Sequence, residues 1–131
     1  MTTDNGNICR RLVGRTAVIT GAGSGIGLAT AHRLASEGAH VVCGDIDETA
    51  GRAAAEAVGG IFVRVDVTDP EQVEALFKAA YDTYGSVDIA FNNAGISPPD
   101  DDSILTTGLE AWKRVQDVNL TSVYLCCKAA L

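Results

Sequence analysis

The chain has 131 residues, of which 47% are hydrophobic and 5% aromatic, and its formal net charge is −7. The basic residues nowhere cluster beyond the Arg10–Arg11 pair and Arg15, so we expect no nucleic-acid partner. No apolar run approaches the ~20 residues that cross a bilayer, and the first eleven residues lack the apolar core of a signal peptide, so we expect a cytoplasmic protein without membrane association.

Short apolar runs alternate with amphipathic segments along the whole chain. Runs that are rich in β-branched residues predict strands, whereas longer segments with helical periodicity predict helices. The predicted elements are strand 16–20, helix 25–38, strand 39–45, helix 47–60, strand 61–67, helix 70–84, strand 87–92 and a last helix from about 107 onward. Because helices separate the strands, the pattern predicts an α/β fold with a doubly wound parallel sheet of the Rossmann type, here its first four strands.

Two helices have packing faces that the sequence predicts. The first helix is expected to pack through Ile26, Ala29, Ala31, Leu34 and Ala35. In the third helix, Asp69 is the expected cap, Pro70 takes the first helical position and Gly85 ends the helix. Its apolar stripe consists of Val73, Leu76, Phe77, Ala80 and Tyr84.

The segment after the fourth strand has a loop and then a helix without an end signal. Pro98 and Pro99 forbid regular structure in the loop, and Thr107 with Glu110 has the spacing of a capping box. No glycine or proline stops the last helix before Leu131. We therefore expect the chain to be the first half of a longer protein, truncated within this helix.

A glycine-rich loop joins the first strand to the first helix in the sequence TGAGSGIG. Residues without a Cβ allow a phosphate to approach the backbone, here at Gly21, Gly25 and Gly27. The start of the helix also offers unpaired N–H groups and partial positive charge to an anion. The same glycines would suit tight strand–helix packing alone. No lysine follows the last glycine, which excludes a P-loop.

Asp45 ends the second strand, 24 residues after Gly21. An acidic residue at about this distance binds a ribose diol in dinucleotide-binding folds, and we favour this role over the alternatives of a solvated residue or a cap of the next helix. An S-adenosylmethionine-dependent methyltransferase would show the same two features. The glycine loop and Asp45 therefore leave both enzyme classes open.

The spacing of the four cysteines is not typical of a metal site. The cysteines are Cys9, Cys43, Cys126 and Cys127. None forms a Cys-x-x-Cys pair, and neither His32 nor His40 lies at ligand spacing from them. We expect reduced structural thiols and no metal.

Further motifs resemble the short-chain dehydrogenase/reductase family. They occur in order as Thr20-Gly21-x-x-x-Gly25-x-Gly27, Asp66-Val67, Asn92-Asn93-Ala94-Gly95 and Val118-Asn119. The resemblance extends from Leu12 to the last residue, and methyltransferases are not expected to carry this combination. It implies that residues 1–131 form a dinucleotide-binding domain.

The resemblance implies a role for each matched residue. The cofactor pyrophosphate would lie against Gly21, Ser24, Ile26 and Gly27. Asp45 would bind the adenosine ribose, and Asp66 would bind the adenine amino group beside the backbone of Val67. A further wall of the cofactor site would be formed by Asn93, Ala94 and Gly95. Asn119 would be catalytic: it would bend its helix locally and hold a water that relays protons to a lysine.

The implied reaction is hydride transfer between a nicotinamide cofactor and a secondary alcohol or ketone, with a lean toward 3-oxoacyl reduction. Asp45 would repel a 2′-phosphate, so the resemblance implies NAD. The serine and Tyr-x-x-x-Lys of the family would follow Leu131, so the chain alone is expected to be inactive. The alternative is a non-catalytic dinucleotide-binding module.

Two expectations concern the last helix. In the resembled family this helix packs against a partner subunit, and its apolar residues occupy more than one face, which implies a homotetramer for the complete protein; they include Leu120, Val123, Leu125 and Ala129. Tyr124 and Lys128 also have Tyr-x-x-x-Lys spacing. Because they follow Asn119 on the same helix, we interpret them as ordinary helix residues rather than the catalytic pair.

Overall fold

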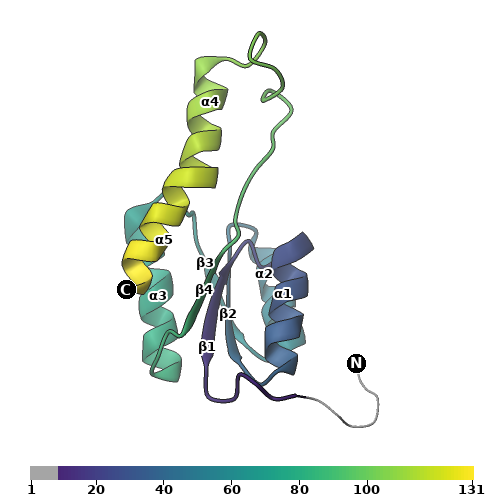
Figure 1. Ribbon diagram of the computed structural model, residues 1–131, viewed down its shortest axis with the longest axis vertical. Coiled ribbons are helices and arrows are strands. Elements are labelled where there is room, and N and C mark those ends of the chain that lie inside the picture. Colours follow the sequence, from purple (N-terminus) through teal and green to yellow (C-terminus); the bar gives the residue numbers. More distant parts are fainter. Residues whose placement is uncertain (1–8) are drawn as a thin grey trace.

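The computed structural model describes residues 9–131, which form one parallel sheet with helices on both faces (Figure 1). The strand order is β3-β2-β1-β4, so the predicted doubly wound α/β fold is confirmed. The elements are β1 Thr16–Thr20, α1 Gly25–Ser36, β2 His40–Asp45, α2 Glu48–Val58, β3 Ile61–Arg64, α3 Pro70–Tyr84, β4 Ile89–Asn92, α4 Leu109–Gln116, the π-helix η2 Asp117–Thr121 and α5 Ser122–Ala130.

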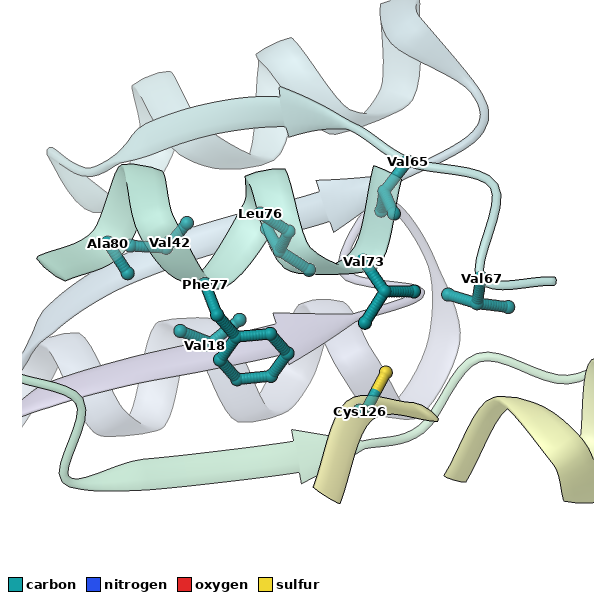
Figure 2. Packing of buried hydrophobic residues seen from close by; sticks show 9 residues of the cluster. All are labelled: Val18, Val42, Val65, Val67, Val73, Leu76, Phe77, Ala80 and Cys126. Atoms are coloured by element: carbon teal, nitrogen blue, oxygen red, sulfur yellow. The ribbon is translucent and has the colours of Figure 1, made fainter. Parts of the chain in front are cut away.

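The two faces of the sheet bury different side chains, because successive residues of a strand point to opposite sides. On one face Ile19 and Val41 pack against small alanines of α1 and α2. On the other face Val18 and Val42 pack against α3 and α5, where Leu76, Phe77 and Cys126 fill the space (Figure 2). All five residues of β1 are buried, so the middle of the sheet is covered on both sides.

Helix α3 has the termini and the packing face that the sequence predicts. The side chain of Asp69 accepts a hydrogen bond from the Glu71 N–H at 3.0 Å, and Gly85 ends the helix with a left-handed φ of 84°. Four of the five predicted stripe residues are buried. The fifth, Tyr84, is half-buried and stacks its ring on His40 with 4.5 Å between centroids.

Several predicted details of the other elements are wrong. Ile26 is 72% exposed and Ala29 is exposed, because α1 packs through Gly27 and Ala31 instead, and Ile26 lies at the pocket. The last helix begins after an N-cap at Gly108 without a side-chain bond, whereas Thr107 accepts its hydrogen bond from the Asp102 N–H in the preceding loop. The second, third and fourth strands are also shorter than predicted.

The last helix is continuous from α4 through η2 to α5, and its first part projects beyond the sheet (Figure 1). Within residues 9–131, α4 contacts η2 and no other helix or strand. The loop that precedes it, residues 95–108, is tied to α4 by Arg114, whose guanidinium donates to both carboxylate oxygens of Asp100 at 2.7 and 2.9 Å. We call residues 96–116 the arm.

None of the helices in residues 9–131 has both the length and the apolar character needed to cross a membrane. The N-terminal segment that we interpret as lacking a signal peptide falls, up to residue 8, outside the described residues.

Candidate functional site

A pocket of about 390 Å³ opens at the carboxyl ends of the strands, a size typical of small-ligand sites. Nine of the ten residues predicted to bind a cofactor line it, and they come from four separate segments of the chain. They are Gly21, Ser24, Ile26, Asp45, Asp66, Val67, Asn93, Ala94 and Gly95. The fold therefore brings the sequence-predicted residues to one place.

The tenth predicted residue, Gly27, lies beneath the pocket and is buried. A Cβ at this position would lie 2.1 Å from the carbonyl oxygen of Gly21 and 2.7 Å from Nδ2 of Asn93. Gly21 itself has a left-handed φ of 69°, and its Cβ would meet the backbone of Ala94 at 3.0 Å. Tight packing thus explains Gly27, whereas Gly21 also faces the pocket.

The N-terminus of α1 points into the pocket with free backbone donors. Its N-cap, Ser24, has an extended backbone and makes no capping bond with its side chain. The first intrahelical hydrogen bond runs from the Leu28 N–H to the Ser24 carbonyl at 3.2 Å, so the N–H groups of residues 25–27 precede the helical pattern. This arrangement can bind an anionic group.

Thr20 and Asn93 fasten the glycine loop to the segment after β4. The buried hydroxyl of Thr20 accepts hydrogen bonds from the N–H groups of Asn93 and Ala94, both at 3.1 Å. In return, the Asn93 amide donates to the carbonyls of Thr20 and Gly21 at 3.2 and 3.4 Å. These contacts join residues 72 to 74 positions apart and set the spacing of the two pocket walls.

Asp45 connects the end of β2 to the glycine loop. Its Oδ2 accepts a hydrogen bond from the Gly23 N–H at 2.8 Å, and its Oδ1 accepts one from the Asp47 N–H at 3.0 Å. The capping of α2, which the sequence left open as a role for Asp45, belongs instead to Asp47, whose side chain accepts from the Ala50 N–H. The Asp45 carboxylate also lines the pocket.

Asp66 follows β3 and is held by its neighbours. Its Oδ1 accepts hydrogen bonds from the Thr68 hydroxyl at 2.7 Å and the Thr68 N–H at 3.0 Å. These two bonds, the hydroxyl one first, lower the pKa of Asp66 below its ordinary value. Val67, the next residue, is buried in the cluster of Figure 2 and still contributes to the pocket wall.

Asn119 lies beside the pocket rather than in its lining. Its Oδ1 accepts from the Ile96 N–H at 2.7 Å and its Nδ2 donates to the Ile96 carbonyl at 2.9 Å. Asn119 is the middle residue of η2, so the helix departs from α geometry at this residue. Such single π turns often occur at functional sites. The two bonds join the last helix to the start of the arm.

Gly25, which the glycine-loop argument includes, also lines the pocket, whereas the sequence prediction missed four lining residues, namely Ile46, Val65, Ile96 and Val118. Each of them is adjacent in sequence to a predicted site residue or belongs to a quoted motif. Ile46 and Ile96 are exposed, large and apolar, and their position directly after Asp45 and Gly95 was the available signal.

Further residues of the quoted motifs and pairs, besides Thr20, also lie outside the pocket lining. Asn92 faces α5, where its amide donates to Sγ of Cys127 at 3.4 Å. Tyr124 is 61% exposed on α5. Lys128 lines a different hollow between α3 and α5.

The cysteines of the described residues are all free thiols. Cys43 and Cys126 are buried, and burial raises the pKa of each thiol to about 11. In residues 9–131, no group of three or more His, Cys, Asp and Glu side chains is arranged to hold a metal ion.

A family model described as enoyl-(acyl carrier protein) reductase matches residues 21–131. Secoisolariciresinol dehydrogenase of Forsythia intermedia is 40% identical over 126 residues, which cover 94% of this chain and 46% of the relative. Cis-4-hydroxycyclohexanecarboxylate dehydrogenase of Sinomonas cyclohexanicum is 46% identical, over 89% of this chain and 48% of the relative. Short chain dehydrogenase/reductase astE of Aspergillus oryzae is 40% identical, over 89% of this chain and 47% of the relative. The chain thus spans about half the length of the curated relatives it matches.

Proposed function

This chain belongs to the short-chain dehydrogenase/reductase family of oxidoreductases, and we propose that residues 1–131 are the dinucleotide-binding part of an NAD-dependent enzyme. By the complete protein we mean this chain together with any sequence that accompanies it in the cell. The proposal is supported by one observation above all: nine residues from four segments line one pocket beside an uncapped helix N-terminus.

The cofactor pyrophosphate is proposed to lie at the start of α1. The free N–H groups of residues 25–27 supply donors and positive potential there. The absence of a Cβ at Gly21 leaves the backbone of the glycine loop accessible to a phosphate. Gly27 allows the helix to pack close to the Gly21 carbonyl. Ser24 and Ile26 would contact the same phosphates from the first turn.

Asp45 is proposed to bind the adenosine ribose and to select NAD over NADP. Each of its carboxylate oxygens accepts one backbone N–H and retains a lone pair for a ribose hydroxyl. Its negative charge would repel a 2′-phosphate, and no lysine or arginine of the described residues lines the pocket to compensate.

Titration of the complete protein with NADH and NADPH tests this selection. We expect NADH to bind at least ~10-fold more tightly, which corresponds to about 1.4 kcal/mol. Asp45→Asn removes the charge and retains one oxygen acceptor for the Gly23 N–H, with loss of the bond from the Asp47 N–H, so it should abolish the preference while the glycine loop keeps its contact. Equal or tighter binding of NADPH to the unaltered protein would refute the proposed selection.

Asp66 is proposed to accept the amino group of adenine, with the backbone of Val67 beside the base. Both residues line the pocket at the end of β3. The remaining wall toward the nicotinamide half is assigned to Asn93, Ala94 and Gly95, whose position is fixed by the contacts with Thr20.

The reaction that we propose is a hydride transfer between the bound nicotinamide and a secondary alcohol or ketone. The cofactor supplies the hydride chemistry, and the protein supplies orientation and proton transfer. Asn119 is proposed to assist by holding a water in a proton relay. Because its side-chain amide already bonds Ile96, a backbone carbonyl in the π turn would hold this water. The serine, tyrosine and lysine of the family are assigned to the rest of the complete protein, so we expect this chain alone to be inactive.

Small secondary alcohols are the first substrate candidates. The relatives named above are dehydrogenases, and one name specifies a hydroxycyclohexane carboxylate. Reduction of a 3-oxoacyl thioester is the second candidate, since the family model refers to an acyl carrier protein. Following NADH formation with hydroxycyclohexanes, and NADH consumption with an acetoacetyl thioester, distinguishes them. A complete protein that binds NADH and turns over neither class would favour the non-catalytic binding module.

A homotetramer located in the cytoplasm is proposed for the complete protein. The last helix carries exposed apolar side chains along its length, at Leu109, Trp112, Leu120 and Tyr124. Exposed apolar surface of this extent is typical of contacts between proteins. The cytoplasmic location rests on the free thiols Cys43 and Cys126.

A further inference from the structure

Hydrogen bonds fix both the side chain and the backbone of Asp66, although this residue lies on a loop. Both bonds from Thr68, at 2.7 and 3.0 Å, end on the same oxygen, Oδ1. The Asp66 N–H donates to Oε1 of Gln72 at 2.8 Å, and Nε2 of Gln72 donates to Asp69, the N-cap of α3, at 3.1 Å. The backbone and side chain of Asp66 are thus both fixed relative to α3.

This arrangement leaves one oxygen of Asp66 for a ligand. Within residues 9–131, Oδ2 accepts no hydrogen bond, while the residue itself lines the pocket. An ionised carboxylate accepts hydrogen bonds and donates none. The hydrogen bonds from Thr68 lower the pKa of this carboxyl, so it stays ionised at neutral pH.

We propose that Thr68 is a positioning residue that makes the pocket select adenine over hypoxanthine by fixing the Asp66 carboxylate. The inference rests on the proposed function, in which Asp66 faces the base. Adenine offers an exocyclic amino donor to Oδ2, whereas hypoxanthine places a carbonyl oxygen there, which the carboxylate repels. Hypoxanthine also has a neighbouring ring N–H, but a carboxylate locked by Thr68 cannot rotate to reach it.

Removing the Thr68 hydroxyl should therefore weaken selection between the bases more than binding itself. Asp66 would keep the bond from the Thr68 N–H and would gain the freedom to turn toward the ring N–H of hypoxanthine. The loss concerns one hydrogen bond, so the expected change in selectivity is about threefold to tenfold.

The test compares NADH with its hypoxanthine analogue, which differs only in this base, by fluorescence titration of the complete protein. The unaltered protein should bind NADH roughly tenfold more tightly. Thr68→Val, which has nearly the same shape, should lower this ratio about threefold to tenfold, and Thr68→Ser should restore it. In an Asp66→Ala background Thr68→Val should leave the ratio unchanged, because Thr68 acts through the carboxylate.

The outcomes separate this inference from the proposed function. A complete protein that binds neither nucleotide contradicts the proposed function itself. Equal binding of both nucleotides to the unaltered protein contradicts the assignment of Asp66. Selective binding that persists in Thr68→Val refutes the role of Thr68 alone. If Thr68→Val does not fold, the ratio of the affinities for NADH and its hypoxanthine analogue can be compared between Thr68→Ala and Thr68→Ser instead.

Discussion

The pocket and the arm are built in opposite ways although they are adjacent in the chain. Around the pocket, loops that follow three parallel strands are linked by hydrogen bonds between segments, such as those of Thr20 to Asn93 and Asp45 to Gly23. In the arm, the bonds are mainly local or exposed, and Ile104 and Leu105 are 89% and 91% exposed. The chain therefore determines the pocket geometry internally, whereas the apolar surface of the arm lacks cover among the described residues.

The two regions meet at Ile96, the first residue of the arm, which also lines the pocket. The Asn119 side chain bonds the backbone of Ile96, where the pocket wall ends and the arm begins. A change in the pocket should therefore affect cofactor binding, a change in the arm should affect assembly, and a change at Asn119 should affect both.

Gly27→Ala is expected to have the largest effect, because the pocket region has no room for it. The new Cβ would lie 2.1 Å from the Gly21 carbonyl oxygen, so the glycine loop would have to shift. We expect NADH affinity of the complete protein to fall by about 100-fold or more, equivalent to about 2.7 kcal/mol.

Gly60→Ala is the matched control, since its Cβ would lie 2.1 Å from the Val41 carbonyl oxygen, away from the pocket. Both variants should lower the melting temperature, but only Gly27→Ala should weaken NADH binding in the folded fraction. Equal losses of affinity would show that the effect is general destabilisation.

Asn119→Ala should have the next largest effect, because it separates the two regions. It removes both hydrogen bonds to Ile96, each of about 1 kcal/mol. We expect NADH affinity to fall about tenfold and turnover of the complete enzyme to fall further, by roughly 100-fold. Asn119→Asp keeps the acceptor for the Ile96 N–H and should show a smaller loss of affinity. Unchanged affinity and turnover in Asn119→Ala would mean that the arm and the pocket are independent.

A double change of Leu109 and Trp112 to glutamine tests the arm alone. Both side chains are largely exposed, Trp112 to 52%, so the free energy of unfolding of each subunit should change by less than about 0.5 kcal/mol. Light scattering of the complete protein should nevertheless show a smaller assembly. Lys113→Gln, on the same helix, is the control that should leave the mass unchanged. An unaltered mass in the double variant would remove the arm from the proposed interface.

Asp88 lies at the amino ends of the strands, opposite the pocket, and its contacts predict a modest pH dependence of stability. The Thr16 N–H and then the Ser86 hydroxyl donate to its carboxylate, both at 2.8 Å, and lower its pKa. A lowered pKa stabilises the fold above the ordinary value of about 3.9, and this contribution is lost as the pH falls through the folded-state value. Asp88→Asn should therefore flatten the decline of the urea midpoint between about pH 5 and about pH 3. A decline as steep as in the unaltered protein would contradict this.

Most of the fold could be predicted because its local signals agree with one another. In α3, the cap at Asp69, the proline at Pro70 and the apolar stripe all indicate the same helix. The errors occur where tertiary contacts override such signals. Thr107 has capping-box spacing, but its hydroxyl bonds the backbone of Asp102. Ile26 continues an apolar period, but α1 packs through the neighbouring Gly27, and Ile26 lies at the pocket.

The pocket was predictable because its residues lie in motifs at the ends of the strands, where a parallel sheet must bring them together. The links between segments could not be predicted. No local pattern indicates that Thr20 bonds Asn93 across 73 positions or that Asn119 bonds Ile96 across 23 positions. The sequence also did not show that Ile46 and Ile96 line the pocket. An exposed isoleucine looks like a core residue in the sequence, and only its place in the fold distinguishes the two.

Tyr124→Phe should have the smallest effect of all, although Tyr124 and Lys128 have the spacing of a catalytic pair. Tyr124 is 61% exposed on α5 and does not line the pocket, while Lys128 borders the hollow between α3 and α5. We expect turnover of the complete enzyme within about threefold of the unaltered protein, because only an exposed hydroxyl is lost. A loss of about 1,000-fold would place the acid–base tyrosine on this helix and would overturn the assignment of the pocket.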